Sequence, residues 1–296
     1  MIVFKKPELE DREVINNYLK RQKSRSCECT FANTYLWSHF YKVEYAIIAD
    51  TLVYQSLGEK QSFTFPIGDD EQIKIALDTL MEHCQKEDIP FRLHLVTPEQ
   101  FVKLEVLYPA TFQINYDEDV ADYVYEREKL ANLSGKKYHG KKNHVNKFKR
   151  TYPDWKYETM TAENIDECFA MAMDWRELNG GDDEPDKVAE MSVTMNYLRL
   201  FHELEMTGGL LRVANKVVAF TIGEPVCEDT FVVHVEKALT EIEGVYPMIN
   251  QQFVLNETDR YLYINREEDT GAEGLRQAKR SYRPVFMVEK GIVTAK

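Results

Sequence analysis

The chain has 296 residues, of which 44% are hydrophobic and 12% aromatic, and its formal net charge at pH 7 is -13. This length and composition exclude a wholly disordered chain and predict two domains of ordinary size. No apolar run reaches the roughly 18 to 20 residues that cross a bilayer, and the N-terminal stretch lacks the apolar core of a signal peptide. We therefore expect a soluble, cytoplasmic protein without a transmembrane segment.

The cysteines give no sign of a disulfide framework. There are five of them, and only Cys27 and Cys29 lie close together, at a spacing unlike that of a zinc-binding pair. We expect reduced thiols, most of them buried, and no metal site.

The first half of the chain alternates helix and strand patterns. Strands are predicted over residues 1–5, 44–49, 52–57, 63–68, 91–96 and 111–116. Helices are predicted around Ile15, around Leu36, and through Ile73, Leu77, Leu80 and Cys84. A further helix begins at Thr97, because Thr97, Pro98 and Gln100 combine a cap, a first-turn proline and a reciprocal glutamine.

The second half repeats a comparable order of elements. Strands are predicted over residues 155–160, 210–214, 217–223, 230–236, 261–265 and 284–289. A hairpin turn at Asn215 and Lys216 is expected to join two of them. Four helices are predicted. The first runs from Thr161 to a stop at Asn179, Gly180 and Gly181, the second passes through Met191, Met195 and Leu198, and the third begins near Gly244. The fourth begins with a capping box of Thr270 and Glu273 and has an apolar stripe of Leu275, Ala278 and Tyr282.

In each half the order is two helices, three strands, helix, strand, helix, strand, which resembles the GNAT acyltransferase fold. Residues 122–148, 234–250 and 263–284 also resemble signature blocks of proteins that carry the phosphatidylglycerol lysyltransferase C-terminal domain, related to the Fem aminoacyl-tRNA-dependent transferases. The resemblance implies an α+β fold of two tandem GNAT-like lobes, each a mixed sheet flanked by helices. We expect an N-terminal lobe over residues 1–130, a basic helical connector over 131–152 and a C-terminal lobe over 153–296.

Residues 136–150 hold seven Lys or Arg and two His without one acidic residue, in a chain that is otherwise strongly acidic. As a helix, the segment places Tyr138, Val145, Phe148 and Tyr152 on one apolar side and its cations on the others. One interpretation is a phosphate-binding surface for tRNA, and the other is a solvated helix that balances acidic neighbours. The cations predicted to bind substrate are Lys137, Lys141, Lys142 and Lys147.

The strand 230–236 alternates so that Val232, His234 and Glu236 share one face. Glu236 ends it where GNAT folds open a gap between neighbouring strands, and a partly buried carboxylate there can take a proton from an attacking amine. The alternative is a structural ion pair of Glu236 with Lys237 or Arg266. His234 is either a substrate-binding group or a hydrogen-bonded core histidine.

Polar groups gather after the strand 261–265. Asn265 and Glu267 are predicted to share a face beside Asp269 and to bind an ammonium group, with loop capping by Asp269 and Thr270 as the alternative. Asn250 is also among the predicted substrate-binding residues.

The last helix holds a candidate acid and a second basic cluster. Within the resemblance, Tyr282 matches the tyrosine with which many GNAT enzymes protonate the leaving group, and core packing is the alternative. Arg276 and Lys279 on the same helix suit a phosphate or the terminal adenosine of tRNA.

The turn at residues 240–248 has one glycine, two Glu and one Pro, where acetyl-CoA-dependent GNAT enzymes have a glycine-rich turn that holds pyrophosphate. We therefore expect aminoacyl or acyl transfer from a phosphate-bearing donor, with aminoacyl-tRNA favoured over acyl-CoA. The acceptor is an amine or hydroxyl of a small molecule, a peptide or a lipid. The alternatives are an acyl-CoA-dependent N-acyltransferase and a noncatalytic module that binds RNA or protein.

Overall fold

The computed structural model describes residues 2–58, 60–179 and 184–296. The chain divides into two units. The first unit comprises Met1–Asp122, Glu268–Glu273 and Met287–Lys296, and the second comprises Tyr123–Glu267 and Gly274–Phe286. Each unit is built around one mixed sheet with helices against it, so the expected α+β class is confirmed.

The first unit has a six-stranded sheet in the order β1-β2-β3-β4-β13-β5. Its elements are α1 (Arg12–Leu19), α2 (Phe31–Tyr41), β1 (Val43–Ile48), β2 (Thr51–Ser56), β3 (Ser62–Thr64), α3 (Asp70–Lys86), β4 (Arg92–Val96), α4 (Pro98–Leu107), β5 (Phe112–Tyr116) and β13 (Gly291–Ala295). Helix α3 buries Ile73, Leu77, Leu80 and Cys84 against the sheet, as their helical spacing predicts. The predicted capping box opens α4, because Thr97 and Gln100 each accept the other's backbone N–H.

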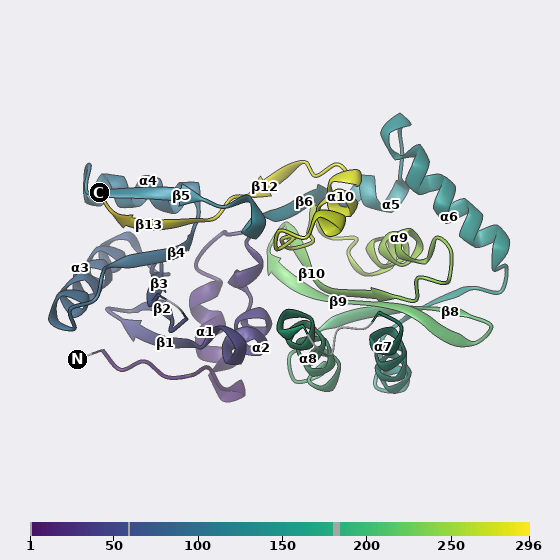
Figure 1. Ribbon diagram of the computed structural model, residues 1–296, viewed down its shortest axis with the longest axis horizontal. Helices are drawn as coiled ribbons and strands as arrows, with labels where there is room; N and C mark the ends of the chain where they lie inside the picture. Colours follow the sequence, from purple (N-terminus) through teal and green to yellow (C-terminus); the bar gives the residue numbers. More distant parts are fainter. Residues whose placement is uncertain (1, 59, 180–183) are drawn as a thin grey trace. The chain divides into compact units, whose positions relative to one another are not determined.

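The second unit has a seven-stranded sheet in the order β12-β6-β11-β10-β9-β8-β7. Its elements are β6 (Asp122–Glu126), α5 (Arg127–Asn132), α6 (His139–Thr151), β7 (Lys156–Thr159), α7 (Ile165–Asn179), α8 (Pro185–Arg199), β8 (Thr207–Val213), β9 (Lys216–Cys227), β10 (Thr230–Ala238), α9 (Val245–Glu257), β11 (Tyr263–Asn265), α10 (Glu273–Ser281) and β12 (Phe286–Val288). Helices α7 and α8 cover one face of this sheet, and α9 and α10 lie on the other (Figure 1).

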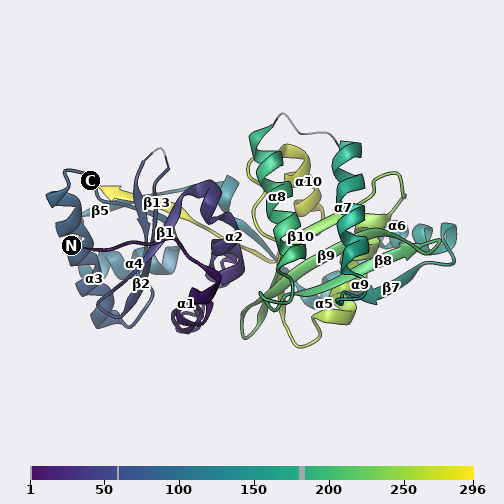
Figure 2. The same cartoon turned by 90° about the horizontal axis from the view of Figure 1, so that it is seen from below.

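Two strands belong to a different sheet from the one that their place in the sequence suggests. Strand β6 precedes the basic helix, yet it pairs with β11 in the second sheet. Strand β13, at the end of the chain, lies between β4 and β5 in the first (Figure 1), and Figure 2 shows it beside β5. The expected lobes, 1–130 and 153–296, are continuous in sequence, whereas the two units are not. The cause is long-range strand pairing, which leaves no local signal in the sequence.

Strand β10 separates from β11 partway along its length. The two strands pair in parallel only from Thr230↔Tyr263 to Val232↔Asn265, while β10 continues to Ala238. On its other side β10 remains paired with β9 as far as Ala238↔Ala219. The end of β10 therefore has the one-sided pairing that was expected for the gap of a GNAT fold.

A β-bulge at His234 changes the direction of the side chains of β10. The register with β9 shifts between Val233 and Val235, and His234 stacks on Tyr197 of α8, whereas Glu236 contacts Asn250 of α9. The prediction that His234 and Glu236 share a face was therefore wrong, because a bulged residue breaks the two-residue alternation of a strand.

Several local predictions also need correction. Residues 1–5 form no strand among the described residues, and Lys5 makes only an isolated bridge to Tyr45. The hairpin turn lies one residue earlier than expected, at Ala214 and Asn215, which both have positive φ. The glycines expected to stop α7, Gly180 and Gly181, lie outside the described residues.

The start and the buried face of α10 also differ from prediction. This helix begins at Glu273, and Thr270 lies three residues before it with a φ of 50°, so Thr270 does not cap the helix as predicted. Leu275 and Ala278 of the predicted apolar stripe are exposed, whereas Lys279 and Tyr282 are buried. Lys279 takes part in the buried face because its ammonium donates to the carbonyl of Glu267 at 3.2 Å.

Candidate active site

Five side chains from separate segments of the second unit meet beside the end of β10, and we call them the Glu236 cluster: Glu236, Arg266, Tyr282, Lys141 and Asn250. Arg266 donates to Glu236 Oε1 at 2.8 Å, and Asn250 Nδ2 donates to Glu236 Oε2 at 3.3 Å. The Arg266 guanidinium lies 5.1 Å from the centre of the Tyr282 ring, and Lys141 Nζ lies 4.0 Å from the same centre. Two residues predicted to be catalytic and one cation of the basic helix are thereby brought together.

Burial and charge set the protonation states in the cluster. Burial raises the pKa of the Tyr282 phenol, with Arg266 opposing and Glu236 reinforcing this shift, so the hydroxyl keeps its proton at neutral pH. Burial lowers the pKa of Lys141, and the positive charge of Arg266 lowers it further, against the attraction of Glu236. Two cations thus face one carboxylate in a largely buried setting.

Glu236 holds Arg266 in place. Both of its carboxylate oxygens already accept hydrogen bonds, and its side chain is only 10% exposed, against 13% for Arg266. The structural ion pair considered as an alternative is therefore present. This pairing suits Glu236 to positioning the guanidinium rather than to taking a proton itself.

The basic helix α6 docks through its predicted apolar side, and Tyr138, Val145 and Phe148 are all buried. Its cations have different surroundings. Lys137, which precedes the helix, and Lys142 are exposed, and Lys147 pairs with Glu243 at 2.6 Å on the surface. Lys141 alone of the four predicted cations turns inward to the Glu236 cluster.

Helix α6 also covers the N-terminus of α9. A Cβ placed on Gly244, the N-cap residue of α9, would lie 2.8 Å from the carbonyl oxygen of His144 and 3.3 Å from Cβ of Phe148. Several N–H groups of this turn are used internally, with Ile242 bonded to Leu239 and Met248 bonded to Gly244. The helix start is thus packed against α6.

His234 forms a second buried polar group with Glu267 and Glu224. Its Nδ1 lies 2.7 Å from Glu267 Oε1, its Nε2 lies 3.1 Å from Glu224 Oε1, and its side chain is 1% exposed. Burial alone would lower the pKa of His234, but the hydrogen bonds and charges of the two glutamates outweigh burial and raise the pKa to about 9. The imidazole is therefore doubly protonated at neutral pH, as its two carboxylate partners require.

This raised pKa predicts a dependence of stability on pH. The stabilisation by His234 is fully present below pH 6.5, the ordinary pKa, and is lost as pH rises through about 9. We expect the free energy of unfolding of the wild type, relative to His234→Gln, to fall by about 3 kcal/mol over that interval. Urea denaturation of both proteins at pH 6 and pH 10 checks this, and an unchanged difference would contradict the charged state.

The remaining predicted residues are not members of the Glu236 cluster. Asn265 is fully buried and its Oδ1 accepts the N–H of Glu267, which places both near His234. In the first unit, Asp269 is fully buried and caps its own loop by accepting the N–H of Gly271. Arg276 is half-buried on α10, and Lys279 is buried rather than displayed to a phosphate.

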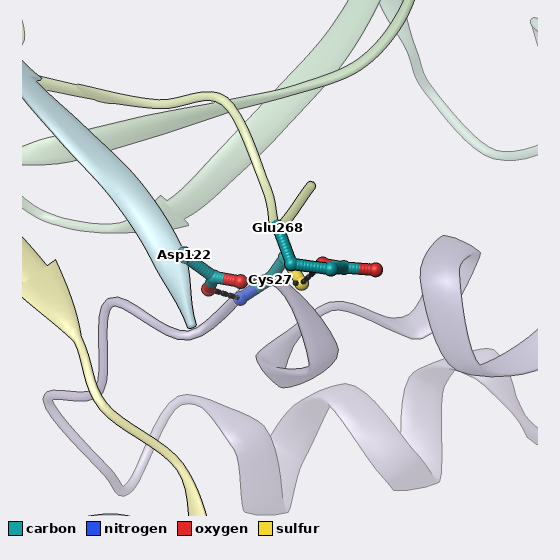
Figure 3. A group of neighbouring side chains, drawn as sticks. All are labelled: Cys27, Asp122 and Glu268. Carbon is teal, nitrogen blue, oxygen red and sulfur yellow. Dashed lines mark hydrogen bonds between the residues drawn. The ribbon is translucent and has the colours of Figure 1, made fainter. Parts of the chain in front are cut away.

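The first unit contains a separate buried polar cluster. Cys27, Asp122 and Glu268 point toward one another (Figure 3), with one ligand atom of each within 4.8 Å of the others. Lys290 Nζ lies 2.6 Å from Asp122 Oδ1 and 3.6 Å from Cys27 Sγ, and it also binds Glu28 at 2.7 Å. Burial and the nearby carboxylates of Asp122 and Glu28 raise the pKa of Cys27, so the thiol keeps its proton beside Lys290. The ammonium of Lys290 thus supplies the cation that balances these acids.

The fold of two mixed sheets flanked by helices is the tandem GNAT-like fold, and other solved structures share it. A conserved protein of unknown function from Bacteroides thetaiotaomicron is 40% identical, with a TM-score of 0.93 over 100% of both chains. The C-terminal domain of a putative lysylphosphatidylglycerol synthetase from Agrobacterium fabrum is 13% identical, with a TM-score of 0.66 over 96% of this chain and 91% of its own. FemX is 7% identical, with a TM-score of 0.61 over 98% and 97%.

Residues 19–293 match the family described as phosphatidylglycerol lysyltransferase, C-terminal, and the chain belongs to this family. An uncharacterized protein of Mycoplasmoides gallisepticum is 23% identical over 185 residues, which span 60% of this chain and 56% of that protein. The family description names a lysyltransferase, and the two structures of 13% and 7% identity show the shared fold. No helix among the described residues has the length and apolar character to span a membrane.

Sequence reasoning did not select three residues that the structure places in or beside the Glu236 cluster. Arg266 was considered only as a partner of Glu236, although a lone arginine directly after a buried strand is a usable signal. Tyr125 lies in β6, a strand that was not predicted, and packs edge-to-face on Tyr282 with the two ring centres 6.5 Å apart. Thr221 lies opposite Glu236 across the β9–β10 pair, which only the register reveals.

Proposed function

We propose that the chain transfers an aminoacyl group from aminoacyl-tRNA to an amine or hydroxyl acceptor, at the Glu236 cluster. The observation that carries the proposal is the position of Lys141, which belongs to the basic helix and yet lies 4.0 Å from the ring of Tyr282. A helix rich in exposed cations and a protonated phenol are thereby joined in one site. Membership of the lysyltransferase C-terminal family supports the same reaction class.

The reaction assigns a role to each group. The nucleophile attacks the ester carbonyl of the donor, a bond from nitrogen or oxygen to carbon forms, and the bond to the ribose oxygen breaks. Arg266 and Lys141 stabilise the negative charge that develops on oxygen, and Glu236 keeps Arg266 oriented. Tyr282 donates its proton to the departing ribose oxygen. The nucleophile loses one proton in the same reaction, so the number of protons is balanced.

The covered start of α9 favours aminoacyl-tRNA over acyl-CoA as the donor. A pyrophosphate at this helix start would have to displace His144 and Phe148 of α6 from Gly244. It would also meet Glu243, which stands directly before Gly244 and pairs with Lys147. Phosphates of tRNA have an alternative surface in the exposed cations of α6, including Lys142 and Arg150.

This proposal predicts salt-dependent binding of tRNA through α6. In Lys137→Ala/Lys142→Ala/Arg150→Ala, we expect weaker binding at low salt, and a slope of log affinity against log salt that is shallower by roughly 0.7 to 0.9 for each phosphate that the variant no longer neutralises. Filter binding of bulk tRNA across a salt series measures this slope.

The matched control removes three exposed lysines of the first unit, in Lys74→Ala/Lys86→Ala/Lys103→Ala, whose side chains are 50%, 75% and 53% exposed. The net charge changes equally in both variants, so only the position of the removed charge differs. Equal loss of binding in both would point to nonspecific electrostatics and contradict a tRNA surface on α6.

A further inference from the structure

Two buried polar atoms beside Glu236 have no hydrogen-bond partner in the part of the chain that the structure describes. They are Oδ1 of Asn250, which is 2% exposed, and Oγ1 of Thr221, which is fully buried. Buried polar atoms are nearly always paired, and leaving one unpaired costs roughly 1–3 kcal/mol. Two such atoms next to the same carboxylate therefore call for a functional explanation.

Both atoms lie on the face of the sheet that α9 covers. Thr221 is the direct partner of Glu236 in the β9–β10 register, and directly opposed residues of antiparallel strands project to the same face. On the other side of β9, Gly209 pairs with Thr221, and the Tyr157 side chain, which bonds to Glu257 of α9, covers that glycine. Thr221 and Glu236 thus project into the region beneath α9, where Asn250 bonds to Glu236.

The orientation of the Asn250 amide is fixed by Glu236. Its Nδ2 donates to the carboxylate at 3.3 Å, and the flipped amide would place an oxygen against an oxygen. The atom left over is therefore an acceptor. Thr221 supplies a hydroxyl beside it, which accepts and donates, so the pair suits a group that carries hydrogen on nitrogen or oxygen.

The charges around this region select a neutral group. Lys141 and Arg266 provide two positive charges against the single negative charge of Glu236, so a third cation would be repelled. A neutral amine or alcohol keeps a lone pair for attack while it donates a hydrogen to Asn250. An ammonium ion would have no lone pair and would be disfavoured by both cations.

We propose that Thr221 and Asn250 form the subsite that holds the attacking nucleophile, a neutral amine or hydroxyl group, beside Glu236. The inference rests on the proposed transfer reaction and adds to it the residues that position the acceptor. It also explains why two unpaired polar atoms are kept where apolar side chains of the same shape would pack without cost.

The test uses ethanolamine, which carries both an amine and a hydroxyl, as acceptor with radiolabelled lysyl-tRNA as donor. In Thr221→Val we expect the KM for ethanolamine to rise about five- to tenfold, with the KM for lysyl-tRNA unchanged. The midpoint of urea denaturation stays the same or increases, because an unpaired buried hydroxyl is removed. Thr221→Ser, which keeps the hydroxyl, restores the wild-type KM. Alkali stability of the product separates an amide from an ester, and so the amine from the hydroxyl.

The control is Thr258→Val, because Thr258 is equally buried but its hydroxyl bonds to the carbonyl of Val254 at 2.9 Å. This variant loses stability without a change in the KM for ethanolamine. If the wild type forms product and Thr221→Val has an unchanged KM for ethanolamine, or a raised KM for the donor alone, the nucleophile subsite is refuted. If the wild type forms no product, the proposed transfer itself fails, and this inference fails with it.

Discussion

Tyr282→Phe is expected to lower the rate of aminoacyl transfer by about 10²- to 10⁴-fold, the usual contribution of a positioned general acid. The variant keeps the aromatic ring against which Lys141, Arg266 and Tyr125 pack, and removes only the hydroxyl. Burial raises the pKa of this phenol, so the wild-type proton is present throughout the neutral range. Binding of the donor is therefore expected to be preserved while chemistry slows.

Single-turnover transfer from radiolabelled lysyl-tRNA, with circular dichroism to verify the fold, measures this effect. Tyr18→Phe is the matched control, since Tyr18 is also buried and its hydroxyl donates to Asp50 at 2.8 Å in the first unit. That variant is expected to lose about 1 kcal/mol of stability and no activity. Full activity in Tyr282→Phe would remove the tyrosine from the mechanism and favour a noncatalytic role for the cluster.

Lys290→Met is expected to destabilise the first unit by about 3–5 kcal/mol, because it leaves the buried carboxylate of Asp122, and the half-buried carboxylate of Glu28, without their cation. The Lys290 and Asp122 side chains are both 0% exposed, so water cannot replace the missing partner. Such a loss is a large part of the stability of an ordinary domain. Chemical denaturation followed by circular dichroism measures it.

Lys103→Met provides the comparison, because Lys103 pairs with Asp70 at a similar distance, 2.6 Å, but with side chains 53% and 79% exposed. Removing this surface pair is expected to cost less than about 1 kcal/mol. Equal effects of the two substitutions would contradict a structural role of the buried Lys290 cluster.

Local signals in the sequence were sufficient for many elements of the fold. The capping box at Thr97 and Gln100 and the apolar spacing along α3 depend on neighbours three or four residues away, and both are confirmed. The docking side of α6 follows from the same spacing rule, with Val145 and Phe148 buried. These features need no knowledge of which strand pairs with which.

The pairing of strands from distant parts of the chain and the bulge in β10 were not predictable in this way. The pairing of β6 with β11 joins residues about 140 positions apart, and nothing in the local pattern of β6 names that partner. The bulge at His234 depends on the register with β9, so the alternation that grouped His234 with Glu236 failed. The buried ammonium of Lys279 donates to the carbonyl of Glu267, and the composition of α10 does not reveal this contact.

The candidate site was predicted in its parts rather than in its arrangement. Glu236, Tyr282 and Lys141 were selected from separate segments, and the structure brings them together through Arg266. Thr221 carries no signal in the sequence, because an isolated threonine in an apolar strand is ordinary. Thr221 becomes a candidate only in the structure, where it lies opposite Glu236 and its Oγ1 has no hydrogen-bond partner among the described residues.

We hold that the basic helix and Tyr282 form one site, and a double-mutant cycle of Lys141→Met and Tyr282→Phe measures whether the two residues act together. Values of kcat/KM for lysyl-tRNA are measured for the wild type, both single variants and the double variant. We predict a coupling energy of about 0.5–3 kcal/mol between the two residues, and near-additive effects when exposed Lys142 replaces Lys141 in the cycle. Additive effects of Lys141 and Tyr282, or no effect of Lys141 at all, would contradict the claim.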